Sequence, residues 1–259
     1  MSSERTRSIR SLGGSARRRF TKLGWAFEDR LLEAEQRRGV LGPAHRRWRD
    51  VTDHHHYWSA YDWSRQGEEW NASPEWKQAL IDDVLLRWIP PGVATLEIGP
   101  GAGRWTDVLV SRASHLTLVD VSERPLELCR QRFGENGHVS YILTQDSELS
   151  GVADDSIGAV WSFDVFVHLA PADQASYLEE ISRALTPGGV AVIHHADGRN
   201  RGFLPSRQGW RSPMSRNLFA TLAAQRGLRI QRQFDSWGPH DSHDLGPFGD
   251  AITVLASVE

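Results

Sequence analysis

The sequence lacks two features that define large classes of proteins. It has a single cysteine, Cys129, so the chain cannot form an internal disulfide. It also has no run of about eighteen apolar residues, the length that a membrane-spanning helix needs. These absences predict a soluble protein of a reducing compartment, and we expect a cytoplasmic location without a membrane partner.

An excess of positive charge is also missing. The formal net charge is −3 at pH 7, which argues against a nucleic-acid partner because such partners need a basic surface. Arginines at residues 17–19 superficially resemble a twin-arginine export signal. Charged residues at 28–30 interrupt the apolar stretch that such a signal requires, so we do not interpret it as one.

Length and composition predict one main domain with an appendage. With 259 residues, of which 39% are hydrophobic, the chain can build a domain of about 170 residues. Residues 1–22 are rich in Ser, Arg and Gly, and we expect them to be a disordered basic tail. Residues 23–90 are expected to be a helical, tryptophan-rich extension whose first part, to about Trp48, is an amphipathic helix serving as a lid or a homodimer contact. Residues 91–259 then form the main domain.

Short apolar runs recur through the main domain. They span residues 93–98, 115–120, 139–144, 157–163 and 190–195. Helical patterns separate them, which predicts an α/β fold with a doubly wound, mostly parallel sheet. Right-handed crossovers in such a sheet bring the carboxyl ends of the strands to one edge, where ligands bind.

Three glycines, Gly99, Gly101 and Gly103, follow the first apolar run and precede a helical pattern. Without Cβ atoms this loop can turn at positive φ and let a ligand lie against the peptide groups, near the unpaired N–H groups of the next helix. A dinucleotide fingerprint would need its third glycine at position 104, which is an arginine. The spacing therefore weakens the interpretation as a pyrophosphate site.

The stretch from Glu97 to Gly103 resembles motif I of the class I S-adenosylmethionine-dependent methyltransferases, E/D-x-G-x-G-x-G. The resemblance extends over about residues 70–258 and implies S-adenosylmethionine as cofactor, with S-adenosylhomocysteine as product. It implies that Glu97 lies near the cationic methionine moiety. It also implies a seven-stranded sheet, closed by the alternating runs 228–234 and 251–256, in which the last strand is antiparallel.

Further cofactor contacts are expected at the ends of the next strands. Asp120 ends the second apolar run, where a carboxylate in nucleoside-binding α/β folds accepts hydrogen bonds from the ribose hydroxyls. It could instead cap the following helix, but Ser122 is better placed for that role. The resemblance places Asp146 at the adenine amino group, and Ser147 and Phe163 are the remaining predicted cofactor-binding residues. A carboxylate at the end of a strand, such as that of Asp146, is also commonly just part of a turn.

Three residues are predicted to act in catalysis. His168 follows the fourth strand, where the resembling enzymes often carry a basic histidine, although it could simply pack against the next helix. The fifth strand ends in His194 and His195, whose side chains must point to opposite faces, so one of them should face the pocket. We assign His195 to catalysis with Asp197, which could orient a histidine or bind a sugar hydroxyl.

The acceptor is expected to be a sugar hydroxyl. The chain resembles actinobacterial sugar O-methyltransferases, in which the paired histidines are followed by a long loop, a Gly-Trp-Arg and a helix; here these are 209–211 and 214–226. The aromatic residues of 50–76 either line the mouth of the pocket or only anchor the extension. The expected substrate-binding residues are Trp70, His194, Trp210 and Trp237.

Several alternatives stay open. The acceptor could be a short oligosaccharide that is a precursor of a methylated polysaccharide, or a phenolic or polyketide natural product, and the protein could also bind S-adenosylmethionine without catalysis. Asp53 with the histidines at 54–56, or the polar segment 237–244 with Asp197 or Asp250, could hold a divalent ion such as Mg²⁺. Adjacent histidines point in different directions, and a polar loop is usually solvated, so no metal residues are assigned.

Overall fold

The computed structural model describes residues 51–135, 137–198, 211–246 and 249–258. The predicted basic tail (1–22), the amphipathic helix up to Trp48, and Trp210 lie outside these residues. Within the described ranges, no helix is both long enough and apolar enough to cross a membrane.

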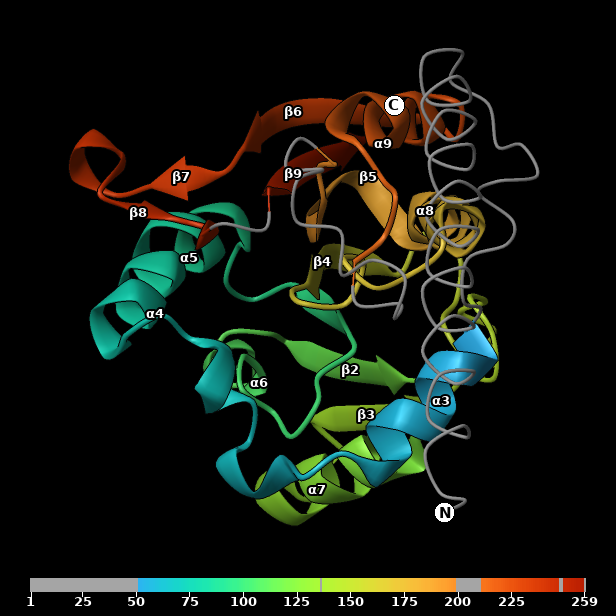
Figure 1. Ribbon diagram of the computed structural model, residues 1–259. Coiled ribbons are helices and arrows are strands. Elements are labelled where there is room, and N and C mark those ends of the chain that lie inside the picture. Colours follow the sequence, from blue (N-terminus) through green and yellow to red (C-terminus); the bar gives the residue numbers. More distant parts are fainter. Residues whose placement is uncertain (1–50, 136, 199–210, 247–248, 259) are drawn as a thin grey trace, which may run out of the picture.

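A seven-stranded sheet forms the centre of the molecule (Figure 1), in the order β3-β2-β1-β4-β5-β9-β6. Neighbours among β1 to β5 pair in parallel, whereas β9 lies antiparallel between β5 and β6. This topology confirms the predicted fold class, including the antiparallel last strand. The strands are β1 Ala94–Ile98, β2 His115–Asp120, β3 Val139–Leu143, β4 Ile157–Ser162, β5 Leu185–Ala196, β6 Leu228–Phe234 and β9 Asp250–Ser257.

Helices connect the strands and cover both faces of the sheet (Figure 1). Their starts carry recognisable signals: Ser73 and Ser215 accept backbone hydrogen bonds as N-caps of α4 and α9, and Pro171 opens α8. The helical stretch 74–88 contains a π-helical turn, η3 Ile81–Leu85, between α4 and α5. The helices are α3 Val51–Ala60, α4 Pro74–Leu80, α5 Leu86–Trp88, α6 Thr106–Leu109, α7 Glu123–Phe133, α8 Pro171–Ala184 and α9 Arg216–Ala224.

Short elements complete the described chain. Two 3-10 turns, η1 Trp63–Arg65 and η2 Glu68–Trp70, join α3 to α4. A small hairpin of β7 Ser236–Trp237 and β8 His243–Asp244 follows β6, with η5 Pro239–Asp241 at its tip. The Trp76 indole N–H donates to the Asp244 carbonyl at 2.7 Å, which fixes this hairpin to α4.

The core is divided by the sheet into two apolar layers. One layer contains buried residues of α8 and α9, such as Leu178, Ile181 and Phe219. The other contains residues of the α4–α5 segment, α6 and α7, such as Leu85 and Leu126. Side chains on β5 alternate between these layers, which decides where its paired histidines go.

Candidate functional site

A hollow that opens to solvent lies at the carboxyl ends of β1, β2 and β4. Its floor contains the glycine loop and Asp120, and its side contains Phe163 and His168. Aromatic residues of the extension form another part of its wall. The hollow therefore occupies the sheet edge that the strand pattern predicted for a ligand.

The three glycines have positive φ values of 71°, 56° and 89°, as expected for this turn. A Cβ atom on Gly99 would overlap Cγ2 of Val165, and one on Gly101 would lie 2.7 Å from the ring of Trp63. Gly103 faces Phe133 of α7 instead, with a Cβ contact of 2.6 Å. Gly99 and Gly101 therefore line the hollow, whereas Gly103 permits the loop to pack on α7.

Two buried carboxyl groups lie at the ends of β1 and β2. Burial raises the pKa of Glu97 to about 8 and that of Asp120 to about 7. Glu97 accepts a hydrogen bond from the Thr106 hydroxyl at 2.6 Å and is not on the wall of the hollow. Asp120 is on the wall, and its Oδ1 accepts the Ser122 N–H at 2.9 Å.

Asp146 and Ser147 lie on the loop between β3 and β4. Asp146 is exposed and accepts the Glu148 N–H through Oδ1 at 2.9 Å, while Ser147 is buried. Neither residue lines the hollow itself. The loop is joined to it through Tyr177, which lines the hollow and whose hydroxyl donates to the Asp146 carbonyl at 3.4 Å.

A charged network that we did not predict closes the hollow between β1 and β4. Arg104 Nη2 lies 2.5 Å from Asp164 Oδ2, and Asp164 has a positive φ of 61°. Burial alone would raise the pKa of Asp164, yet the Arg104 guanidinium and His194 hold it well below its usual range. Behind it, His194 Nδ1 lies 3.1 Å from Asp164 Oδ1, and His194 Nε2 lies 3.4 Å from Asp250 Oδ2.

The paired histidines face opposite layers of the core, as expected. His194 points to Phe163 and Asp164, close to the hollow but behind its wall. His195 is fully buried on the other face, stacked on Phe219 at 3.9 Å, with Nε2 2.7 Å from Thr253 Oγ1. Burial lowers the pKa of His195 to about 3.

Three predicted site residues, His195, Asp197 and Trp237, do not line the hollow. His195 cannot reach the hollow because the sheet separates them, so a catalytic role does not fit its position. Asp197 binds Arg216 at the start of α9, where Oδ1 accepts the backbone N–H at 3.0 Å and Oδ2 lies 2.8 Å from Nε. Trp237 is buried against Trp76 at a centroid distance of 5.3 Å and does not line the hollow.

His168 and Trp70 do line the hollow. The His168 ring lies 5.6 Å from that of Trp58, and its backbone N–H donates to the Val165 carbonyl. Trp70 is partly exposed, and the Arg104 guanidinium lies 5.5 Å from its ring. Both residues can therefore contact a ligand.

The aromatic rings of the extension form one cluster, which comprises Tyr57, Trp58, Tyr61, Trp63 and Trp70. Neighbouring centroids are 4.8 to 6.1 Å apart. The Trp63 indole N–H donates to the Trp58 carbonyl at 3.1 Å, and Trp58, Trp63 and Trp70 line the hollow. The cluster therefore both anchors the extension and builds the mouth of the hollow.

The described part of the chain contains no group of three or more His, Cys, Asp or Glu residues arranged to hold a metal ion. In the polar segment 237–244, the Asp241 carboxylate binds the Ser236 hydroxyl at 3.0 Å. The side chains of Asp53, His54 and His56 lie outside the described residues.

Comparisons with known proteins agree with this architecture. A family model described as "Methyltransferase domain" matches residues 96–193. A Mycobacterium avium (strain 104) protein described as "Putative O-methyltransferase" is 35% identical over 182 residues, covering 67% of this chain and 73% of the relative. A Mycobacterium marinum relative with the same description is 34% identical over 182 residues, covering 67% of this chain and 72% of the relative.

Solved structures show the same fold. The N-methyltransferase NodS from Bradyrhizobium japonicum, in complex with S-adenosylhomocysteine, is 18% identical with a TM-score of 0.59, over 82% of this chain and all of NodS. A methyltransferase in complex with the Haloferax volcanii activator Trm112 is 20% identical with a TM-score of 0.60, over 81% of this chain and 98% of that methyltransferase.

Proposed function

Because this chain belongs to the S-adenosylmethionine-dependent O-methyltransferases, we propose that it methylates a hydroxyl group of a sugar or a short oligosaccharide, such as a precursor of a methylated polysaccharide. The observation that carries the proposal is the hollow, in which a nucleoside-type carboxylate, Asp120, and a histidine, His168, line one space. The main domain (91–259) supplies its floor, and the extension (23–90) acts as a lid.

The chemistry of the lining fits the cofactor. Asp120 would hold the ribose, and the loop at Gly99 and Gly101 would lie against the methionine moiety. Asp146 and Ser147 lie beside the hollow and not on its wall, on the loop that Tyr177 joins to it, and from there they would meet the adenine. Aromatic faces such as those of Trp58 and Trp63 attract a positively charged group, which suits a sulfonium. Glu97, which accepts the Thr106 hydroxyl just after the loop, adds negative charge only when it is ionised, because burial raises its pKa to about 8.

The bound cofactor supplies an electrophilic methyl group. The protein's part is to align the acceptor oxygen, to exclude water and to take the proton. Alignment of two reactants can lower the barrier by about 7–11 kcal/mol, whereas a general base contributes about 10²- to 10⁴-fold in rate. In this proposal His168 is the base that accepts the hydroxyl proton, and the wall around it does most of the catalytic work by positioning.

The mixed character of the mouth supports a sugar acceptor. Exposed ring surface at Trp70 offers a platform for the C–H face of a sugar, while Gln66, Arg104 and Asp164 place polar groups on the same wall. The number of aromatic rings in that wall also favours a second candidate, a phenolic or polyketide acceptor. A protein that binds the cofactor without catalysis is the third.

Radiolabelled S-adenosylmethionine, incubated with a panel of sugars, oligosaccharides and phenols, with and without EDTA, separates these candidates. We expect transfer to a sugar hydroxyl; transfer only to phenols supports the second candidate. Binding of S-adenosylhomocysteine without any transfer supports the third.

The role of His168 is tested by His168→Ala, with His138→Ala as the matched control because His138 lies outside the hollow. We expect kcat to fall by about 10²- to 10⁴-fold in His168→Ala. The affinity for S-adenosylhomocysteine should stay near that of the wild type in both variants. Full activity of His168→Ala would remove this residue from the mechanism.

A further inference from the structure

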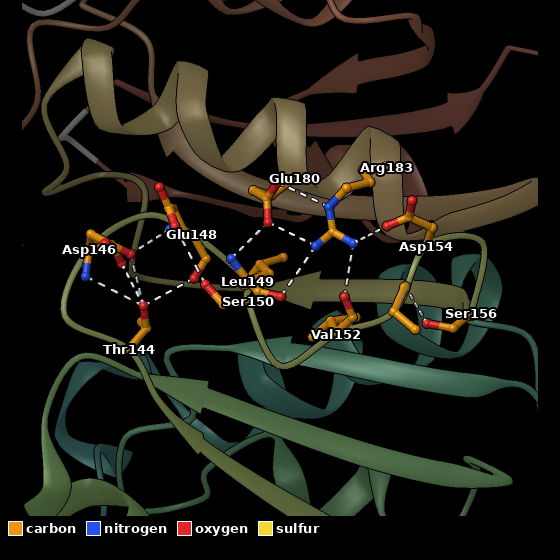
Figure 2. Close-up of polar contacts among 11 residues, drawn as sticks. Thr144, Asp146, Glu148, Leu149, Ser150, Val152, Asp154, Ser156, Glu180 and Arg183 are labelled. Carbon is orange, nitrogen blue, oxygen red and sulfur yellow. Dashed lines mark hydrogen bonds and ion pairs between the residues drawn. The ribbon is translucent and has the colours of Figure 1, made fainter.

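Two charged residues of α8 hold the loop between β3 and β4 (Figure 2). The Arg183 guanidinium donates to the Val152 carbonyl at 2.9 Å and to the Leu149 carbonyl at 3.2 Å. Glu180 Oε2 accepts the Leu149 N–H at 2.9 Å. Side chains of α8 thus satisfy three backbone groups that have no partner in the sheet ladder.

The two charged residues also fix each other. Arg183 Nη2 lies 2.8 Å from Glu180 Oε2, and Nε lies 3.1 Å from Oε1. Asp154, on the far side, accepts from Nη1 at 2.5 Å. A planar guanidinium can serve all these acceptors at once because its donors are arranged in a rigid fork, which a lysine ammonium lacks.

The other end of the same loop carries Asp146. Its carboxylate accepts the Glu148 N–H at 2.9 Å, and the Thr144 hydroxyl lies 3.2 Å from the same oxygen (Figure 2). Its carbonyl accepts from Tyr177, one helical turn before Glu180 on α8. The direction of the Asp146 side chain therefore depends on a loop whose two ends are both fixed to one helix.

Glu148 and Leu149 link these two ends directly. The Glu148 N–H orients Asp146, and the next residue, Leu149, is fully buried and bonded to both Glu180 and Arg183. A shift of Leu149 would therefore move the group that orients Asp146. The contacts of Arg183 lie at one end of the loop and Asp146 lies at the other (Figure 2).

We propose that Glu180 and Arg183 are positioning residues that set Asp146 and Ser147 for recognition of the adenine base. This inference rests on the proposed function, in which Asp146 and Ser147 meet the base. Neither Glu180 nor Arg183 lines the hollow, so both act through the loop and not by touching the ligand.

The test uses a base analogue. Calorimetry measures the dissociation constants of S-adenosylhomocysteine and S-inosylhomocysteine, in which a carbonyl replaces the adenine amino group. Wild type should prefer the adenosyl compound. Arg183→Lys should weaken adenosyl binding about tenfold, change inosyl binding much less, and raise the KM for S-adenosylmethionine without changing kcat at saturation. Glu180→Gln keeps an acceptor for Leu149 and should show a smaller effect in the same direction.

Arg130→Lys is the matched control. Arg130 is also a helical arginine paired with a glutamate, with the same side-chain exposure of 30% as Arg183. The Arg130→Lys variant should leave the preference for the adenosyl over the inosyl compound unchanged. The inference would be overturned if Arg183→Lys weakened the binding of both compounds equally, or if both α8 variants kept the wild-type preference for the adenosyl compound. A wild-type protein that showed no preference would overturn it as well. If wild type bound neither compound, the proposed function itself would fail.

Discussion

Asp120 makes cofactor affinity depend on pH in a defined direction. Burial raises the pKa of this carboxyl to about 7, so the free protein holds a proton there over the lower part of the physiological range. A ribose hydroxyl that donates to Asp120 prefers the ionised form, because a carboxylate is the stronger acceptor. Binding should therefore release about half a proton per ligand at pH 7, where about half of Asp120 is protonated, and more at pH 6.

The size of the effect follows from the ionised fraction. With a pKa of about 7, roughly a tenth of Asp120 is ionised at pH 6 and roughly nine-tenths at pH 8, so affinity should rise about tenfold between them. Asp120→Asn removes hydrogen bonds to a charged group, each worth about 1.5–3 kcal/mol. At pH 8 one such bond corresponds to about 10- to 150-fold weaker binding. At pH 6 the ratio between the affinities of wild type and Asp120→Asn should be about tenfold smaller than at pH 8.

The stability of the ligand-free protein should change in the opposite sense. A carboxyl group whose folded pKa is raised contributes stability that is complete below its unfolded value, 3.8, and is lost as pH rises through about 7. Asp120→Asn removes this buried charge. The variant should therefore be more stable than wild type at pH 8, by at most about 4 kcal/mol, although it binds the cofactor less well.

Calorimetry with S-adenosylhomocysteine at pH 6, 7 and 8, in two buffers of different ionisation enthalpy, measures both affinity and proton release. Urea denaturation without ligand measures stability. Glu123→Gln, a neighbouring carboxylate with a side-chain exposure of 48%, is the control and should behave as wild type. The reasoning is refuted if Asp120→Asn retains the affinity and the pH slope of the wild type.

Two further perturbations test the packing around the site. Gly99→Ala should lower the free energy of unfolding by roughly 1–3 kcal/mol in urea denaturation, because its Cβ would overlap Val165 at a residue with a positive φ. Adding Val165→Ala should recover part of this loss. If the double variant recovered nothing, the overlap would be contradicted. The His195 ring should show no titration between pH 5 and 8 by NMR, because burial lowers its pKa to about 3; an inflection near 6.5 would show that the ring reaches solvent.

Much of the fold could be predicted because a buried parallel sheet leaves a direct trace in the sequence. The strand at 115–120 and the glycine turn after Ile98 are local patterns, and both occur where expected. The alternation on β5 also predicted that His194 and His195 face opposite layers. The alternation could not predict which histidine faces which layer, because that depends on the face of the sheet against which α8 and α9 pack.

The charged network needed three-dimensional information. Arg104 and Asp164 are far apart in sequence, but β1 and β4 are parallel neighbours, with Glu97 opposite Trp161. The chain segments that follow these two strands therefore start next to each other, and Arg104 and Asp164 join them. Hydrophobic periodicity locates strands but carries no information on which strands are neighbours, so it could not bring these two segments together.

The place of β9 has a consequence for biosynthesis. A ribosome delivers β6 before β9, yet β6 pairs with β9 and not with β5. While β9 is still in the exit tunnel, β5 is paired only with β4, and the N–H and C=O groups on its other edge face the solution without a neighbour. Such an open edge invites pairing with another nascent chain. Sheet closure must thus wait until β9 has left the ribosome, and chaperone contact should concentrate before that point.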